Sequence, residues 1–494
     1  MGGQVFLVGA GPGDPELITL KGKRLLESAE VVIYDRLVDP RLLRWAAKAE
    51  VVYVGKGSRE RAAEQEEINE LLVHHARRGK RVVRLKGGDP FVLGRGGEEA
   101  EALVEAGIPF EVVPGVTSAS AVPAYAGIPV THRDLASSVT IITGHEAEGR
   151  GQSRIAWDKL ATGADTLVIL MGLENLQAIA ERLVKYGRSA TTPVALIRRG
   201  SLPQQKTVVG TLADIALKAR AEDMAPPAIL VVGEVVRLRD KLSWFEQKPL
   251  FGRRVLVTRA TAQASQLSQL LSEAGAEVVE LPAIETMPQP QLLDKALGHL
   301  EKFDWIIFTS PNGVEAFGDR LFASGRDSRI LARSKIAAIG PATAQSLKGF
   351  GLLADLVPQD YSTPGLIAAL KGKITPGSHV LLPRSSLADK ELIAALSQMG
   401  AEVEEVDAYV TQFTQGDKVD LENIDIITFT SSSTVKGLHS RLGSWEPIQG
   451  AVVAAIGQAT AKTCAQLGLK VDVVASEHTI PGLVKALINY ITKG

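Results

Sequence analysis

Short runs of valine, isoleucine and leucine alternate with segments of helical period along the whole chain. Examples are VFLVGA near the start, TLVILMG in the first half, and RRVLVTR, WIIFTS and IITFTS in the second half. Such alternation is typical of α/β domains built on parallel-rich sheets. A chain of 494 residues exceeds what one core holds, because single domains usually contain roughly 150 residues. The sequence therefore predicts several α/β units.

The alternation lapses between Arg237 and Gly252, where the sequence reads RLRDKLSWFEQKPLFG. Charged residues followed by proline and glycine are typical of domain boundaries. We therefore expect the main boundary near Lys248, with one domain over residues 1–246 and a second over residues 250–494.

The net charge and the cysteine content indicate which classes of ligand and binding partner to expect. The formal net charge of −1 does not favour binding to nucleic acid or to an anionic membrane. The single cysteine, Cys464, excludes an internal disulfide and a thiol-based metal site, so we expect a cytoplasmic location and no metal. The opening run VFLVGA has the length of one strand and leads into a glycine loop, which argues against a signal peptide. We expect small-molecule ligands.

The second half repeats itself at a spacing of about 120 residues. WIIFTSPNGVEAF from Trp305 recurs as IITFTSSSTVKGL from Ile426, and AAIGPATAQSL from Ala337 recurs as AAIGQATAKTC from Ala454. Two similar lobes with a cleft between them are the expected result. Each repeat places hydroxyl or glycine residues between a strand and a helix, where backbone N–H groups favour anions. Helix capping alone is the alternative explanation of these residues.

Three glycine-bearing loops follow predicted strands in the first half. They are GAGPGDP from Gly9, KGGDPF from Lys86 and PGVTSASA from Pro114. The first is similar to the dinucleotide fingerprint GxGxxG, and Asp35 ends the next strand, where a ribose-binding acid would stand. However, Asp14 replaces the third glycine, and Pro12 and Pro15 remove N–H donors that a pyrophosphate would need. A dehydrogenase of Rossmann type remains the alternative for this half.

Longer motifs of the first half resemble the uroporphyrinogen-III C-methyltransferases. The motifs are VGAGPGDPELITLKGKRLLESAEVVIYDRLV, VGKG, RLKGGDPFVLGRGGEE, VVPGVTSASAVPAYAGIPVTHRDLASSVTIITGH, LVILMGL and APPAILVVGEVV, in the order of that family. The resemblance implies a two-subdomain tetrapyrrole methyltransferase fold, S-adenosyl-L-methionine as methyl donor, and a homodimer. It also implies donor contacts at Pro12, Gly87, Gly88, Asp89, Val92, Thr117, Ser118, Met171, Gly200 and Ala228.

The chemistry of methyl transfer to a pyrrole carbon suggests roles for further residues. Positive charge moves from sulfur to the pyrrole as the new bond forms, so a nearby carboxylate helps; Asp35 is the candidate base. Lys56 is a candidate proton donor or carboxylate ligand. A substrate rich in carboxylates favours guanidinium clamps, because guanidinium binds carboxylate in a bidentate manner. The candidate clamps are Arg95, Arg133, Arg198 and Arg199.

The second half has no His, Cys or acidic cluster with the spacing of a nucleophilic or metal site, so motifs alone leave a ligand-sensing domain open. Yet GRRVLVTR, QLSQLLSEAGAEVVELPAIE, DWIIFTSPNGVEAF, AAIGPATA, DAYVT and FTSSSTVKGL resemble uroporphyrinogen-III synthase. The resemblance implies a two-lobed fold with parallel-rich sheets, one lobe over about residues 250–280 and 410–494 and the other over 281–409.

The same resemblance implies closure of hydroxymethylbilane to uroporphyrinogen III, with inversion of the last pyrrole. Hydroxymethylbilane is already activated, so the enzyme mainly has to hold this linear substrate in the folded conformation that closes the ring. Tyr409 is the candidate for protonating the departing hydroxyl, with a buried structural tyrosine as the alternative. The candidate substrate contacts are Arg259, Thr309, Ser310, Asn312, Arg384, Thr430, Ser431, Ser432, Gly457 and Thr460. Together the halves would convert hydroxymethylbilane to the dimethylated product precorrin-2.

Overall fold

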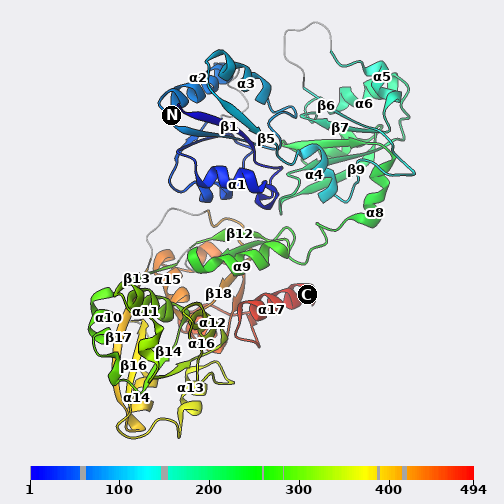
Figure 1. Ribbon diagram of the computed structural model, residues 1–494. Helices are drawn as coiled ribbons and strands as arrows, with labels where there is room; N and C mark the ends of the chain where they lie inside the picture. The colour runs from blue at the N-terminus through cyan, green and yellow to red at the C-terminus, as the bar shows by residue number, and fades with distance from the viewer. Residues whose placement is uncertain are drawn as a thin grey trace. The chain divides into compact units, whose positions relative to one another are not determined.

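The computed structural model describes residues 2–55, 63–145, 154–258, 261–281, 283–385, 390–413 and 420–493. The chain forms two compact units, residues 1–252 and 253–494. The described residues of each unit form two five-stranded sheets with helices around them (Figure 1). The fold is α/β, as predicted.

The first sheet of the first unit is entirely parallel. Its order is β3-β2-β4-β1-β5, with β1 Gln4–Gly9, β2 Val31–Tyr34, β3 Glu50–Tyr53, β4 Arg81–Lys86 and β5 Phe110–Val113. Figure 1 shows α2 (Ala63–Arg77) and α3 (Gly96–Glu105) on one side of this sheet and α1 (Leu20–Glu27) on the other. The strands β1 and β2 are buried on both faces, which explains why they read as apolar runs.

The second sheet of the first unit is mixed. Its order is β6-β7-β10-β8-β9, with β6 Val139–Thr143, β7 Thr166–Leu170, β8 Pro193–Arg198, β9 Lys206–Thr211 and β10 Ala228–Val232. Only the pair β6–β7 is parallel among the described strands. Its helices are α4 (Ser118–Tyr125), α5 (Trp157–Gly163), α6 (Leu176–Lys185), α7 (Ile215–Ala221) and α8 (Arg239–Leu242).

One sheet of the second unit joins both ends of that unit. Its parallel order is β12-β11-β18-β19-β20, with β11 Arg254–Val257, β12 Glu277–Glu280, β18 Ile426–Phe429, β19 Val452–Ala455 and β20 Val473–Val474. Its helices are α9 (Thr261–Glu273), α15 (Ser432–Leu442), α16 (Gln458–Gln466) and α17 (Ile480–Lys493). The first strand of the half therefore pairs with a strand about 170 residues later, and the Thr258 and Thr428 hydroxyls add hydrogen bonds between these two strands.

The other sheet of the second unit has the order β13-β17-β16-β14-β15. Its strands are β13 Ile284–Pro288, β14 Trp305–Phe308, β15 Lys335–Ala338, β16 His379–Ser385 and β17 Glu402–Phe413, and only β13 runs antiparallel to its neighbour. Its helices are α10 (Pro290–Leu297), α11 (Pro311–Ala323), α12 (Pro341–Gly349), α13 (Thr363–Leu370) and α14 (Glu391–Gln398). The order β14-α11-β15-α12 recurs as β18-α15-β19-α16, so the sequence repeat is also a structural repeat.

Candidate active sites

The three glycine loops of the first unit lie at the carboxyl edge of its parallel sheet and touch one another. Gly88 N donates to Gly11 O at 2.7 Å, and Gly11 N donates to Gly88 O at 3.2 Å. A Cβ on Gly115 would lie 2.3 Å from Gly88 O, and one on Gly9 would lie 2.5 Å from the Gly115 Cα. Side chains at these positions would force the loops apart, so glycine is needed for the backbones to approach so closely.

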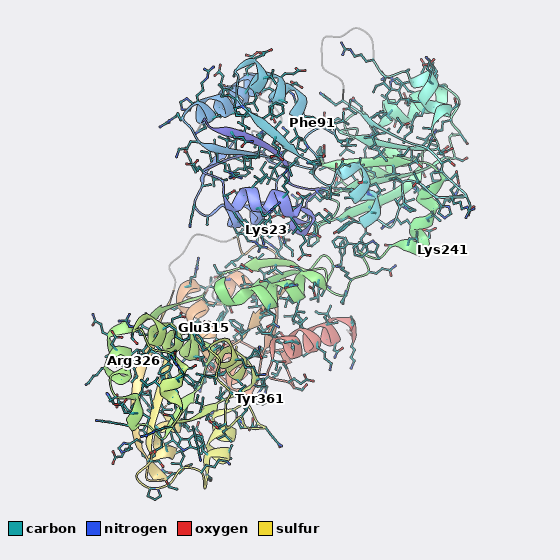
Figure 2. All side chains as sticks on the ribbon, in the orientation of Figure 1. Lys23, Phe91, Lys241, Glu315, Arg326 and Tyr361 are labelled. Atoms are coloured by element: carbon teal, nitrogen blue, oxygen red, sulfur yellow. The ribbon has the colours of Figure 1, made fainter. Side chains whose placement is uncertain are left out.

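Asp89 joins the second and third of these loops. Its Oδ1 accepts from Phe91 N at 2.8 Å, and its Oδ2 accepts from Gly115 N at 3.0 Å. Phe91, labelled in Figure 2, is 56% exposed on the loop that follows β4, and Val92 comes next. Gly87 precedes Gly88, whose backbone has a φ of +69°. A Cβ on Gly87 would lie 2.9 Å from the Leu37 Cβ, whereas one on Gly88 would meet no atom closer than 3.7 Å, so the space that a ligand could use adjoins Gly88.

The structure brings several predicted donor contacts to one place. A Cβ on Gly88 would lie 3.7 Å from Ser118 N, at the start of α4, where Thr117 caps the helix by accepting from Ala119 N. A Cβ on Gly13, next to Pro12, would lie 3.3 Å from the Gly200 carbonyl oxygen. The loops after β1, β4 and β8 and the start of α4 therefore converge.

The remaining predicted donor contacts lie at an edge of the second sheet. Met171 follows β7 with a φ of +55° and is 52% exposed. Ala228 opens β10 and pairs with Arg198 at the end of β8, while Ile229 pairs with Leu170, the last residue of β7. The register therefore places Met171, Ala228 and the start of the Gly200 loop at the same edge.

Asp35 follows β2 and contacts a buried charged cluster that the sequence analysis missed. Its Oδ2 accepts from Arg84 Nη2 at 3.3 Å, and its side chain is 30% exposed. Arg84 Nε and Lys86 Nζ both donate to Glu99 Oε1, at 3.0 Å and 2.8 Å. The side chain of Glu99 is fully buried, and its Oε2 has no hydrogen-bond partner among the described residues. The guanidinium of Arg84 therefore connects a buried carboxylate to one at the edge of the sheet.

The buried cluster has physical consequences for its members. Burial and the neighbouring Arg84 charge lower the pKa of Lys86, although the Glu99 carboxylate opposes this shift.

The sequence contains a signal for this cluster. Arg84 and Lys86 are two residues apart in a central strand, so both side chains point to one face of the sheet and need a buried acid. Lys56, the other predicted catalytic residue of this half, lies outside the described residues.

The predicted arginine clamps of the first half differ in their surroundings. Arg95 is half exposed and bonds Glu98, three residues later on α3. Arg133 lies exposed on a loop, and the N–H of Arg199 donates to the Pro227 carbonyl. The Nε of Arg198 is buried without a hydrogen-bond partner among the described residues. Such a donor is costly unless a ligand accepts from it.

In the second unit, the structure brings together Tyr409 and Ser310. The hydroxyls of these residues are 3.0 Å apart, and Ser310 Oγ also accepts from Gly313 N at the start of α11. Tyr409 lies on β17 and is 8% exposed, and burial raises the pKa of its phenol. Asn312 is half-buried on the first turn of α11. The phenol is therefore neutral at physiological pH and can act as a donor.

The repeated loop in the other sheet carries hydroxyls without a tyrosine partner in the described contacts. Ser431 Oγ caps α15 by accepting from Thr434 N at 3.3 Å and lies 2.9 Å from Ser433 Oγ. Ser432 Oγ accepts from Thr463 Oγ1 at 2.8 Å. These bonds are helix caps and links between α15 and α16, with Thr430 half-buried just before them.

A ring side chain covers the glycine at the next loop of each repeat. A Cβ on Gly457 would lie 2.9 Å from His478 Cδ2, and one on Gly340 would lie 3.2 Å from the Cβ of Tyr361, which is labelled in Figure 2. Thr460, on the first turn of α16, is 4% exposed. The repeat therefore extends through the loops before α13 and α17 into these helices, where PGLIAAL from Pro364 recurs as PGLVKAL from Pro481.

Two arginines of the second half were predicted to contact the substrate, and the structure describes one of them. Arg384 is buried on β16, and its Nε donates to Glu405 Oε1 at 2.8 Å, while Lys390 Nζ donates to Glu405 Oε2. Arg259 lies outside the described residues.

The described residues contain no group of three or more His, Cys, Asp or Glu side chains arranged to hold a metal ion. Among the helices that the structure describes, none combines the length and apolar character needed to span a membrane.

Comparison with known families identifies the two halves separately. The model of the tetrapyrrole (corrin/porphyrin) methylases matches residues 4–216, and that of uroporphyrinogen-III synthase HemD matches residues 265–485. Porphyrin biosynthesis protein HemD of Ruminiclostridium josui is 40% identical over 495 residues, which covers 98% of each chain. Uroporphyrinogen-III C-methyltransferase of Bacillus subtilis (strain 168) is 42% identical over 359 residues, 72% of this chain and 74% of that one.

Solved structures also match parts of the chain. The uroporphyrin-III C-methyl transferase of Thermus thermophilus, crystallised with S-adenyl homocysteine, is 45% identical with a TM-score of 0.41. The match covers 48% of this chain and 94% of that one.

Proposed function

The chain belongs to the family in which a tetrapyrrole methylase is fused to a uroporphyrinogen-III synthase, and we propose that its halves act in sequence on one substrate. It is a uroporphyrinogen-III synthase and a uroporphyrinogen-III C-methyltransferase in one polypeptide. The second half closes hydroxymethylbilane with inversion of ring D, and the first half transfers two methyl groups to the product, giving precorrin-2. A dehydrogenase fused to a ligand-sensing domain is not supported, because both family matches are to tetrapyrrole enzymes.

The first half binds S-adenosyl-L-methionine at the loops after β1, β4 and β8. The space beside Gly88 provides a cradle that a side chain would fill, and the first turn of α4 meets it there, while Gly87 packs against Leu37. When bound, the donor supplies an activated methyl group. The chain's own contribution is to exclude water and to hold the reacting carbon in line, which can account for most of the acceleration.

Asp35 acts on the pyrrole that has accepted the methyl group. Its side chain is 30% exposed, so it is open to a ligand, while Arg84 fixes its Oδ2 from the buried side. A carboxylate held in this way stabilises the positive charge that forms on the pyrrole and then takes the proton. Lys56 is proposed to donate a proton or to hold a substrate carboxylate.

Carboxylates of the tetrapyrrole bind to arginines around the first site. Arg198 is the best supported of these, because its buried Nε lacks a partner among the described residues. Arg133 is exposed on its loop, so its guanidinium is accessible to a substrate carboxylate. Arg95 would have to exchange Glu98 for a substrate carboxylate.

The second half uses hydrogen bonds more than charge. The Tyr409 phenol, whose pKa is raised by burial, is proposed to protonate the departing hydroxyl, with Ser310 fixing its orientation. The hydroxyls of Ser431 and Ser432 are proposed to receive substrate carboxylates at the repeated loop. We further propose that the protein is cytoplasmic and forms a homodimer through the methyltransferase half.

The observation that carries this assignment is the match of one relative to 98% of the chain, across both halves. Incubation of the full-length chain with hydroxymethylbilane and S-adenosyl-L-methionine should yield precorrin-2. Omission of the donor should stop the reaction at uroporphyrinogen III. The products are oxidised and separated by chromatography, because spontaneous closure gives the I isomer instead. Appearance of the I isomer alone would refute the synthase assignment.

A further inference from the structure

The segment Ser243–Phe251, which we call the strap, follows α8 and packs on the first unit. Phe245 and Leu250 are 5% and 0% exposed, so the strap carries its own apolar anchors. Trp244 Nε1 donates to the carbonyl oxygen of Ala124, near the end of α4, at 3.0 Å. The segment ends one residue before the division between the two units, and its contacts belong to the first unit.

The aromatic residues of the strap enclose Tyr125, the last residue of α4. The Tyr125 ring lies 5.1 Å from that of Trp244 and 4.8 Å from that of Phe245, measured between centroids. The hydroxyl of Tyr125 donates to Asp14 Oδ2 at 2.8 Å. Burial and the Asp14 carboxylate raise the pKa of Tyr125, so its proton stays in this bond. The strap therefore reaches the first glycine loop through one side chain.

A second connection runs through Glu246 of the strap. Its Oε1 accepts from Gln205 Nε2 and Thr207 Oγ1, both at 2.7 Å, and its Oε2 pairs with Arg239. Gln205 is 4% exposed, and its Oε1 accepts from Ser201 N at 3.0 Å. This route ends at the loop after β8.

Both connections meet at Asp14. The N–H of Asp14 donates to Ser201 Oγ at 3.2 Å, while its carboxylate accepts from Tyr125. Asp14 is two residues after Pro12, and Ser201 follows Gly200; both neighbours are proposed donor contacts. Buried hydrogen-bond networks are rigid when every member is satisfied and costly when one is lost. The network thus couples the strap to two donor loops.

Apolar packing alone does not explain this arrangement. Phe245 and Leu250 would suffice to cover the surface, and Trp244 already bonds to the end of α4. Glu246, by contrast, is a charged group with only 20% of its side chain exposed, and it converges with three donors. Placing a carboxylate there costs desolvation, which is offset by the ion pair with Arg239 and the hydrogen bonds from Gln205 and Thr207.

We propose that the strap positions the donor-binding loops of the methyltransferase, with Tyr125 and Glu246 as positioning residues that fix Asp14 and Ser201. The inference rests on the proposed binding of S-adenosyl-L-methionine by the first half. Both residues are proposed to act through Asp14 and Ser201 and not on the reacting atoms, so donor affinity should depend on them more than the chemical step does.

The test uses full-length variants and calorimetric titration with S-adenosyl-L-methionine. Tyr125→Phe keeps the ring and removes the hydroxyl, and Glu246→Ala removes the acceptor; each should raise the donor Kd about five- to tenfold. Glu246→Gln keeps one acceptor oxygen for Gln205 and should recover part of the affinity. The matched control is Glu234→Gln, which removes an exposed carboxylate that pairs with Arg237, and it should bind as the wild type does.

Steady-state rates separate positioning from general damage to the fold. The KM for the donor should rise with the Kd, while kcat at saturating donor stays within about twofold and the synthase rate is unchanged. If Tyr125→Phe binds the donor with wild-type affinity, or lowers kcat without changing KM, the proposal is wrong. Should Glu246→Ala fail to fold, Tyr125→Phe decides the question by itself. Lack of binding by the wild type would instead overturn the proposed methyl-donor site.

Discussion

The two halves place different chemistry at the ends of their strands. In the first half, Asp35 at the edge of the sheet is tied by Arg84 to the buried Glu99. In the described part of the second half, the corresponding loops carry serine and threonine caps, and Tyr409 bonds to Ser310. The difference fits the proposed reactions, because methyl transfer needs a base, whereas an activated bilane mainly needs to be folded and given one proton.

Both halves also bury an arginine beside a glutamate, and the two glutamates differ in their exposure to water. The Glu99 side chain is 0% exposed and shares one oxygen between Arg84 and Lys86. The Glu405 side chain, which pairs with Arg384, is 22% exposed and bonds Lys390 through its other oxygen. Water can therefore compensate Glu405 more readily than Glu99 if an arginine is lost.

The largest expected effect concerns the proposed base. Asp35→Ala should slow methyl transfer by about 10²- to 10⁴-fold, the usual contribution of a general base, because the pyrrole loses its proton acceptor. The donor Kd should change little, and the synthase rate of the same chain serves as an internal control. Single-turnover methylation and calorimetry provide the measurements. Full turnover by this variant at saturating donor would contradict the assignment.

Asp89→Ala should have the opposite profile. Asp89 bonds the backbone of the second and third glycine loops, so its loss should weaken donor binding by about tenfold or more, with a smaller effect at saturating donor. The pair of variants distinguishes a residue of the chemical step from one of the binding pocket. Identical profiles for both would mean that the roles are wrongly divided.

Replacement of the buried arginine should lower the free energy of unfolding more in the first half than in the second. Arg84→Met leaves the fully buried Glu99 with Lys86 but without access to water, which should lower the free energy of unfolding by about 3–5 kcal/mol. Arg384→Met should cost about 1–3 kcal/mol, since Glu405 keeps Lys390 and some water. Hydrogen exchange of peptides covering β4 and β16 locates each loss. Equal losses in the two strands would show that exposure of the glutamate is not the deciding factor.

Tyr409→Phe should reduce the rate of isomer III formation by about 10²-fold if the phenol protonates the departing hydroxyl. Because burial raises its pKa, the folded wild-type protein keeps this proton below the ordinary value of about 10, and its contribution is lost only as pH rises above that value. The wild-type synthase rate should therefore show no tyrosine-dependent decline between about pH 7 and 10. A decline in that range that disappears in Tyr409→Phe would contradict this prediction.

The smallest expected effect compares the two repeated helix caps. Ser431→Ala should lower the free energy of unfolding by about 1 kcal/mol, as expected for loss of an N-cap. Ser310→Ala should cost more, because the buried Tyr409 hydroxyl also loses its bond to Ser310. Chemical denaturation monitored in both variants gives the comparison. A larger loss at Ser431 would imply that the Tyr409 hydroxyl has another partner.

Local patterns in the sequence determined much of this protein. Apolar runs of strand length predicted the α/β class, and the repeat predicted the matching orders around β14 and β18. The hydroxyls of Ser310 and Ser431 were expected at the starts of helices, where they are observed. Each of these features depends on residues close together in the chain, so spacing and residue type suffice to predict it.

The tertiary structure alone decided how distant charged and polar side chains pair. Arg84, on β4, pairs with Asp35, which follows the neighbouring β2, and Glu246 bonds Gln205, just before β9, and Thr207, on β9. In the sequence, the strap has the composition of a linker. The sequence does not indicate which residues its charged side chains bond. Burial makes such pairs necessary, but the choice of partner depends on packing between elements far apart in the chain.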